Sequence, residues 1–384
     1  MPAGSRSLIA HCRAGFEPET AADLARLASG LREEFSMDAP VGRGFVVATL
    51  DRLDFRSLAR AFEHSPPIFA RSLFAGAGPH TLIDPSASKA RPDRVGPLAT
   101  LIEQLAAEVA PDDRAPRANP SPVFDEVRLE TPDTNEGKAL SGLTRSLAAR
   151  LAGELTSRGL LRPHPSADAT TLPTRYLHVL FADGAHAYVG TSAAPWASRW
   201  TMGIPRLRMP GRAPSRSTLK LAEAFTVFLG AHELDSLRAG MRAVDLGAAP
   251  GGWTWQLARR GVRVTAVDNG PLKGEVVDDP LVTHVRADGL KYLAKRPVDW
   301  MVCDIVEQPS RIAALVARWI GEGHARQAIF NLKLPMKKRY DEVRRCESII
   351  RDALAKARIE PTLVLRQLYH DREEVTGYLR NPRE

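Results

Sequence analysis

Cysteine is scarce in this chain of 384 residues, which contains only Cys12, Cys303 and Cys346. Three widely separated cysteines exclude a disulfide framework and a cysteine-based metal centre, and they suit a reducing compartment. No apolar run approaches the length of a membrane span, and the apolar stretch at residues 8–10 is too short for a signal peptide. We therefore expect a cytoplasmic protein that binds neither a membrane nor a metal.

Acidic residues are fewer than basic ones, 45 against 53, which gives a net charge of +8 and favours a polyanionic partner. Residues 191–220 contain no acid at all, although they contain six cations and two tryptophans. Guanidinium groups suit phosphate and indoles can stack on unpaired bases, so residues 191–215 are predicted to be a basic linker that contacts RNA. The alternative is a solvated linker with two buried tryptophans. The residues concerned are Trp196, Arg199, Trp200, Arg206, Arg208, Arg212, Arg216 and Lys220.

Two α/β regions are predicted before this linker. Strand and helix patterns alternate as β-α-β-α-β, which predicts a small ferredoxin-like domain over residues 1–80, with helices at 19–27 and 55–64. Segments rich in proline, serine and aspartate at 78–96 and 111–120 indicate loops. Residues 81–190 form the second region, with strands at 123–129 and 176–181 and a helix at 140–160 that buries a leucine stripe.

Residues 243–260 have the pattern of a buried strand, a glycine turn and a helix. The apolar strand residues precede Gly247, Gly251 and Gly252. Glycines let the backbone approach a ligand closely, and the first turn of a helix presents unpaired N–H groups. The spacing G-x-x-x-G-G differs from the dinucleotide fingerprint G-x-G-x-x-G. We expect this turn to form the nucleotide-binding edge of a doubly wound α/β sheet.

Carboxylates follow the next two candidate strands. The apolar run 262–267 ends in Asp268, which lies 21 positions after Gly247, and the run 283–287 ends in Asp288. An acid at the end of the second strand is suited to ribose hydroxyls, and Asp288 is suited to an adenine amino group. Both are predicted to share a crevice with the glycine turn. The alternative is an ordinary core turn with two incidental surface carboxylates.

Residues 245–253 resemble the cofactor loop of the FtsJ-like family of S-adenosylmethionine-dependent ribose 2′-O-methyltransferases. The segments 215–221, 302–304, 330–338 and 369–375 are similar to a member that acts on ribosomal RNA of the large subunit. This resemblance implies a Rossmann-like class I methyltransferase domain over residues 216–384, with a seven-stranded sheet whose last strand is antiparallel. Residues 123–191 resemble a THUMP domain, an RNA-binding module; a purely supporting α/β domain is the alternative.

The resemblance implies a catalytic tetrad of Lys220, Asp304, Lys333 and Glu374. Because the last strand runs antiparallel, its first residue, Glu374, is expected at the sheet edge where the strands before Asp304 and Lys333 end. A lysine base needs a pKa near about 7 to 8. Burial and Lys220 would lower the pKa of Lys333, whereas the two acids would raise it, so Lys333 is either a base or a group that orients the hydroxyl. Glu373 is the alternative to Glu374.

The resemblance also implies the residues that hold S-adenosylmethionine. Asp268 is expected to hold the ribose, Asp288 the adenine and Ser217 the methionine end, while Asp304 serves both cofactor and substrate. Where some relatives carry cysteine this chain has Ala249, but the backbone makes that contact. The full set is Ser217, Ala249, Pro250, Gly251, Gly252, Trp253, Asp268, Asp288 and Asp304.

The implied partner is 23S ribosomal RNA, free rather than in the assembled subunit, with a cytidine as the target and the protein as a monomer. Lys337, Lys338 and Arg339 would grip RNA phosphate, unless they only form a solvated helix start.

Three other functions remain open: 2′-O-methylation of another RNA, a dinucleotide-dependent oxidoreductase, and a non-catalytic RNA-binding assembly protein. The oxidoreductase would also use glycine turns and Asp268, but it leaves Lys220, Lys333 and Glu374 without a role.

Overall fold

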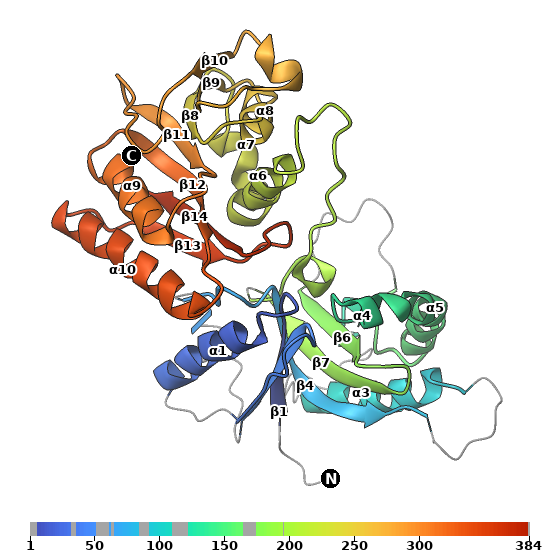
Figure 1. Ribbon diagram of the computed structural model, residues 1–384. Helices are drawn as coiled ribbons and strands as arrows, with labels where there is room; N and C mark the ends of the chain where they lie inside the picture. The colour runs from blue at the N-terminus through green and yellow to red at the C-terminus, as the bar shows by residue number, and fades with distance from the viewer. Residues whose placement is uncertain are drawn as a thin grey trace. The chain divides into compact units, whose positions relative to one another are not determined.

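The computed structural model describes residues 6–31, 36–50, 61–62, 65–83, 92–109, 122–163, 174–194 and 196–382. The chain divides into two compact units, residues 1–204 and residues 205–384 (Figure 1). Each unit is built around its own sheet. Within the described ranges, no helix is both long enough and apolar enough to cross a membrane.

The described strands of the first unit form one seven-stranded sheet in the order β2-β3-β1-β4-β7-β6-β5. Among these described strands, only β5 and β6 pair in parallel. Pairing of β4 with β7 carries the sheet across the domain boundary expected near residue 80, and the division of residues 1–190 into two domains stays a prediction. The strands are β1 (Arg6–His11), β2 (Ser36–Asp38), β3 (Phe45–Leu50), β4 (Ser72–Thr81), β5 (Glu126–Glu130), β6 (Arg175–Phe181) and β7 (His186–Ala193).

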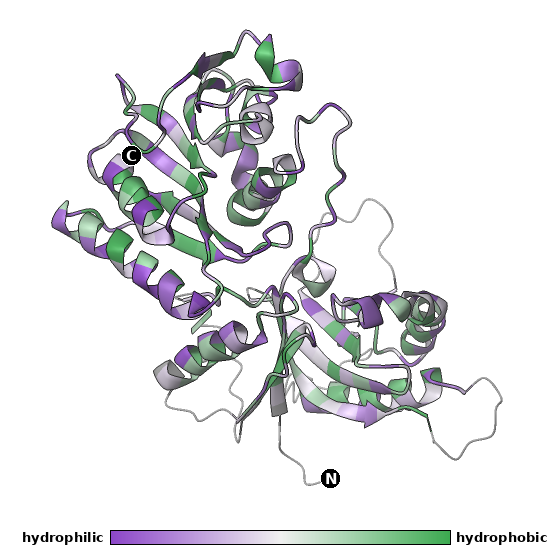
Figure 2. Ribbon diagram, in the orientation of Figure 1, coloured by the Kyte–Doolittle hydropathy of each residue, from purple (hydrophilic) through white to green (hydrophobic). Residues whose placement is uncertain are grey.

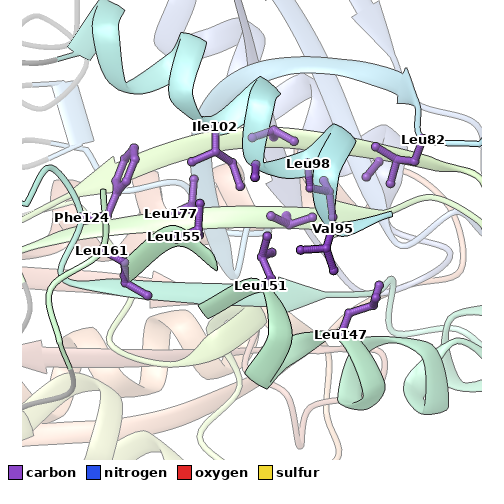
Figure 3. Close-up of a cluster of buried hydrophobic side chains, with 14 of the residues drawn as sticks. Leu82, Val95, Leu98, Ile102, Phe124, Leu147, Leu151, Leu155, Leu161 and Leu177 are labelled. Carbon is purple, nitrogen blue, oxygen red and sulfur yellow. The ribbon is translucent and has the colours of Figure 1, made fainter. Parts of the chain in front are cut away.

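Leucine-rich helix faces cover this sheet. Leu147, Leu151 and Leu155 recur every four residues of α5 (Ser141–Ser157), so they lie on one face and pack with α3 (Val95–Val109) against the strands (Figure 3). A second cluster joins α1 (Glu17–Leu31) to β1 and β3. A short helix, α4 (Asn135–Ala139), precedes α5, and the helix expected at 55–64 lies mostly outside the described residues.

The second unit has the predicted Rossmann-like methyltransferase sheet, in the order β10-β9-β8-β11-β12-β14-β13. Its strands pair in parallel except β14, which runs antiparallel to both β12 and β13, so the prediction for the last strand is confirmed. The strands are β8 (Arg242–Leu246), β9 (Arg263–Val267), β10 (Val282–Val285), β11 (Val298–Cys303), β12 (Ala325–Lys333), β13 (Thr362–Arg366) and β14 (Glu374–Arg380).

Helices of the second unit bury apolar faces against its sheet. Trp300 and Ile329 of the strands pack with Leu221, Phe225 and Leu257 in one cluster. Hydrophilic and hydrophobic stretches alternate along the outer helices α9 and α10, as Figure 2 shows. The helices are α6 (Thr218–Ala224), continued by the π-helix η2 (Phe225–Leu229), α7 (Glu233–Ser236), α8 (Gly252–Ala258), α9 (Pro309–Gly321) and α10 (Arg339–Lys356), with short 3₁₀ turns at Gly230–His232 and Gly274–Val277. A further 3₁₀ turn, Thr201–Gly203, belongs to the first unit.

Replacing Leu151 by alanine is expected to lower the free energy of unfolding by about 2–5 kcal/mol, because the side chain is fully buried and its loss leaves a cavity. Arg145→Ala, at an exposed position of the same helix, serves as the control and should change stability by less than about 0.5 kcal/mol. Urea denaturation measures both values. Equal losses in the two variants would contradict the packing of α5.

Candidate active site

The glycine turn after β8 is built so that the backbone passes close to its neighbours. Gly247 has a φ of +79°, and a Cβ added there would lie 2.7 Å from Cγ1 of Ile305. Gly251 has a φ of +113°, where only glycine is comfortable, and α8 begins at the next residue. Glycine at these two positions therefore lets the turn pack closely against Ile305 and Val276.

A cavity of about 280 Å³ opens at this edge of the sheet. Four of the predicted cofactor residues line it, namely Ala249, Asp268, Asp288 and Asp304. Gly247 of the predicted glycine turn also lines it. Residues that sequence reasoning missed complete the wall: Val267, Asn269, Ala287, Gly289, Leu290, Ile305 and Val306. The cavity thus combines three carboxylates with apolar walls, a lining suited to a nucleoside.

Asp268 organises two loops at the mouth of this cavity. Its Oδ2 accepts a hydrogen bond from the Ala249 backbone N at 3.0 Å, and its Oδ1 accepts from the Gly270 N at 2.7 Å. Each carboxylate oxygen retains acceptor capacity for a further donor, because an ionised carboxylate offers about four lone-pair sites. Two ribose hydroxyls would fit this acceptor.

The other predicted cofactor residues do not line the cavity. Trp253 is buried in the hydrophobic core, and its indole Nε1 donates to the carbonyl oxygen of Ser217 at 3.1 Å. The Ser217 hydroxyl lies beside Gly252, where an added Cβ would approach its Oγ to 2.4 Å. Pro250 and Gly251 belong to the same turn. The cofactor role of these five residues stays a prediction.

The predicted tetrad lies together at the carboxyl edge of the sheet. Lys333 ends β12 and pairs in register with Glu374, the first residue of the antiparallel strand β14. The Lys333 ammonium contacts Asp304 directly and donates to Oε2 of Glu374 at 2.9 Å. Lys220, from α6, donates to both oxygens of Glu374 at 2.7 and 2.6 Å, and its Nζ lies 3.8 Å from Asp304. The four side chains are each 12–19% exposed.

Glu374 rather than its neighbour enters this cluster. The carboxylate of Glu373 points away from both lysines and pairs with Arg339 at 2.9 Å, with its side chain 61% exposed. The Glu373 carbonyl accepts the backbone N–H of Leu334 at 2.7 Å and so ties the two strand-end loops together.

Sequence reasoning missed Asn331, which lies two residues before Lys333 on β12. Its side chain is fully buried, and its Nδ2 donates to Oδ1 of Asp304 and to Oε2 of Glu374, both at 2.9 Å. The only signal in the sequence was an amide inside an apolar strand. Asn331 therefore lies on the buried side of the tetrad and links its two carboxylates by hydrogen bonds.

The Lys333 ammonium is stabilised by its surroundings. Burial lowers the pKa of Lys333, but the carboxylates of Asp304 and Glu374 raise it, and the net shift is upward. Lys333 is therefore protonated at neutral pH in the unliganded protein. A lysine in this state can orient an oxygen by donating to it but cannot take up a proton.

Exposed cations flank the tetrad. Lys337 and Lys338 follow Lys333 on the surface, next to Met336, whose relative exposure is 95%. Arg339 starts α10 and pairs with Glu373. The predicted contact of these cations with RNA phosphate stays a prediction.

The segment expected as a basic linker, residues 191–215, is divided between the two units. In the first unit, the Arg128 guanidinium donates to the carbonyl of Ser198 at 2.7 Å. Trp196 packs against Phe62, with ring centroids 6.0 Å apart. This part of the segment is thus built into the first unit, and its contact with RNA stays a prediction.

Comparison with known proteins assigns the chain to a family. Residues 213–353 match the family described as FtsJ-like methyltransferase, residues 93–193 match the N-terminal domain of ribosomal RNA large subunit methyltransferase M, and residues 5–74 match the RlmM ferredoxin-like domain. A ribosomal RNA large subunit methyltransferase M of Azoarcus sp. (strain BH72) is 46% identical over 384 residues, covering 98% of each chain. The chain belongs to the ribosomal RNA large subunit methyltransferase M family.

Other members of this family show the same likeness. The protein of Aromatoleum aromaticum is 47% identical over 375 residues, covering 97% of this chain and 94% of its own. That of Cellvibrio japonicus is 45% identical, covering 97% and 99%. Among solved structures, Aeropyrum pernix fibrillarin in complex with natively bound S-adenosyl-L-methionine is 17% identical, covering 52% of this chain and 81% of its own at a TM-score of 0.33.

Replacing Glu374 by glutamine is expected to lower the pKa of Lys333, because one of the two carboxylates that stabilise its ammonium is lost. The shift can be followed by NMR titration of lysines labelled with ¹³C at Cε. Glu347→Gln is the control, since Glu347 pairs with arginines on α10 and does not touch the tetrad. An unchanged or raised pKa of Lys333 in the Glu374 variant would refute this electrostatic account.

Proposed function

We propose that this protein transfers a methyl group from S-adenosylmethionine to the ribose 2′-hydroxyl of a cytidine in 23S ribosomal RNA. The observation that carries the proposal is the closed cluster of Lys220, Asp304, Lys333 and Glu374 beside a nucleoside-sized cavity. Membership of a ribosomal RNA methyltransferase family supports the RNA class of the substrate. The ribose position and the cytidine rest on the resemblance of the tetrad and its flanking motifs alone.

The cavity residues suit S-adenosylmethionine as the methyl donor. Asp268 holds the ribose hydroxyls of the cofactor, and Asp288 faces its adenine, since both carboxylates line the cavity. Apolar contacts from Leu290 and Ile305 fit the adenine ring. When bound, the cofactor supplies a methyl group on a sulfonium, which is already a good leaving group. The protein therefore has to align the acceptor oxygen and remove its proton.

Asp304 joins the cofactor cavity to the tetrad, because it lines the cavity and also contacts Lys333. A ribose entering beside Asp304 would meet the Lys333 ammonium. We assign Lys333 the role of donating to the 2′-oxygen and fixing its direction, because its raised pKa does not suit a free general base. As the oxygen–methyl bond forms, the hydroxyl proton leaves toward the carboxylate of Asp304 or Glu374, or to water. Lys220 holds Glu374 in place.

The surface cations at the same edge suit RNA. Lys337 and Lys338 are exposed next to Lys333, and phosphate contacts of this kind position an RNA without reading its sequence. The THUMP-like region and the basic segment 191–215 would add further RNA contacts. Free 23S ribosomal RNA is the substrate form that the resemblance favours, and the protein acts as a monomer in the cytoplasm.

Replacing Lys333 by alanine is expected to reduce methyl transfer to unmodified 23S ribosomal RNA by at least about 100-fold, while S-adenosylmethionine still binds. The reason is that the acceptor oxygen loses its orienting donor while the cavity is unchanged. Transfer of labelled methyl measures activity, and calorimetry measures binding. Lys356→Ala, an exposed lysine at the end of α10, is the control and should leave both unchanged.

Full methyl-transfer activity of the Lys333 variant would show that Lys333 has no catalytic role. RNA binding without methyl transfer by the wild-type protein would favour a non-catalytic RNA-binding protein. Binding of NAD in place of S-adenosylmethionine would favour an oxidoreductase.

Replacing Asp268 by alanine is expected to weaken S-adenosylmethionine binding by roughly 1–3 kcal/mol, because the ribose hydroxyls lose their acceptor and the turn at Ala249 loses its anchor. Calorimetric titration of wild type and variant measures the difference. Asp235→Ala, on the short helix α7, provides the matched control and should bind normally. Equal affinity for S-adenosylmethionine in all three proteins would show that Asp268 does not bind the cofactor.

A further inference from the structure

A buried chain of polar side chains leads from the tetrad into the interior of the same unit. Asn331 is fully buried, and its Nδ2 donates one hydrogen to Asp304 and the other to Glu374. Its Oδ1 lies 2.8 Å from Oγ1 of Thr376 on β14. Thr376 Oγ1 in turn lies 3.0 Å from Oδ1 and 2.8 Å from Oδ2 of Asp371. Thr376 and Asp371 are also fully buried.

The hydrogens along this chain can be counted. The two acids next to Asn331 fix its NH₂ group toward them, so its oxygen faces Thr376 and can only accept. The single hydroxyl hydrogen of Thr376 therefore points to Asn331. The contact between Thr376 and Asp371 then has no hydrogen left, unless the carboxyl group of Asp371 supplies one. A protonated Asp371 completes every bond in the chain.

We propose that Asp371 is a neutral carboxylic acid at pH 7 and that, through Thr376 and Asn331, it is a positioning residue for the tetrad. Asp371 donates to Thr376, Thr376 donates to Asn331, and Asn331 donates to Asp304 and Glu374. The amide orientation of Asn331 is thereby fixed, and with it the placement of both carboxylates around Lys333. The inference deepens the proposed methyl transfer and rests on it.

The surroundings of Asp371 favour its neutral form. Burial, together with the carboxylates of Glu374 and Glu223, raises the pKa of Asp371 to about 8, although its contacts with the Leu368 N–H and the Thr376 hydroxyl act to lower it. The Leu368 N–H donates to Oδ2 at 2.9 Å, and Oδ1 lies 3.0 Å from Oγ1 of Thr376.

Charged groups of the tetrad, Glu223 of α6 and His370 lie near this chain. Asp304, Lys220 and Lys333 lie beyond Asn331. On α6, Glu223 accepts from the backbone N and Nδ1 of His370, the residue before Asp371.

Loss of the Asp371 proton would break the chain at its centre. Thr376 would then donate to the new carboxylate, Asn331 would lose its only donor, and its amide would no longer be held against the two acids. Since the folded pKa is raised, the stabilised arrangement is present at lower pH and lost as pH rises through about 8. Methyl transfer at saturating substrates should decline over the same range.

The test compares pH profiles of kcat for the full-length protein, with unmodified 23S ribosomal RNA and S-adenosylmethionine at saturation. Asp371→Asn keeps a donor toward Thr376 at every pH, so we expect activity within about threefold of wild type at pH 7 and no decline near pH 8. Thr376→Val, which lacks the hydroxyl, should lower kcat by about tenfold or more with unchanged cofactor affinity. Thr376→Ser retains the hydroxyl and should restore most of the activity.

Two outcomes would overturn the proposal. One is an Asp371→Asn variant as impaired as Thr376→Val, and the other is the same alkaline decline in that variant as in wild type. A measurement that does not depend on enzyme activity tests the neutral acid separately from the proposed function. The ¹³Cγ resonance of Asp371, assigned by its absence in Asp371→Asn, should titrate near pH 8. Titration near pH 4 would refute the neutral acid even if the RNA substrate were wrong. Wild-type protein that transfers no methyl to RNA would instead refute the proposed function.

Discussion

Pairing of Lys333 with Glu374 across β12 and β14 is the constraint on which the site depends. The two ammonium groups and two carboxylates come from α6, from the residue after β11, and from β12 and β14. They would not meet if the last strand were parallel, because its first residue would then lie at the opposite edge. The antiparallel strand brings an acid to the edge where Asp304 follows β11 and Lys333 ends β12. Opposite charges then hold the cluster together in a partly buried setting.

The same edge provides the cavity proposed for the cofactor, and Asp304 both lines this cavity and belongs to the tetrad. The glycine turn after β8 forms one wall of the cavity and the strand end at Asp268 another. In the proposed reaction, a methyl donor in the cavity and an acceptor at the tetrad would both lie next to Asp304. The carboxylates keep Lys333 charged, and in that proposal the charged lysine directs the acceptor oxygen.

Much of the fold follows from patterns that a sequence displays directly. Apolar runs that end in Asp268, Asp304 and Lys333 predict strands whose ends share an edge, and the structure has strands at all three places. The extent of β4 was not predictable in this way, because its polar end is held by pairing with β7 rather than by burial. The Trp253 indole packs in the core, and the expected contact of Trp253 with the cofactor stays a prediction.

The inner part of the site was beyond sequence reasoning for a physical reason. Asn331 and Thr376 stand inside apolar strands and carry no spacing signal, so only their register across β12 and β14 reveals that they face each other. The direction of the Lys333 pKa shift also depends on distances, because burial and the neighbouring acids act in opposite senses. Which effect prevails depends on distances of a few ångströms between charged groups, and a sequence does not give these distances.

The most direct test of this account is to incubate the protein with S-adenosylmethionine labelled in its methyl group and unmodified 23S ribosomal RNA, and to map the label by nuclease digestion and mass spectrometry. The account predicts one labelled nucleotide, a cytidine with the methyl group on its ribose 2′-oxygen. A label on a base, or no transfer to the RNA at all, would contradict it.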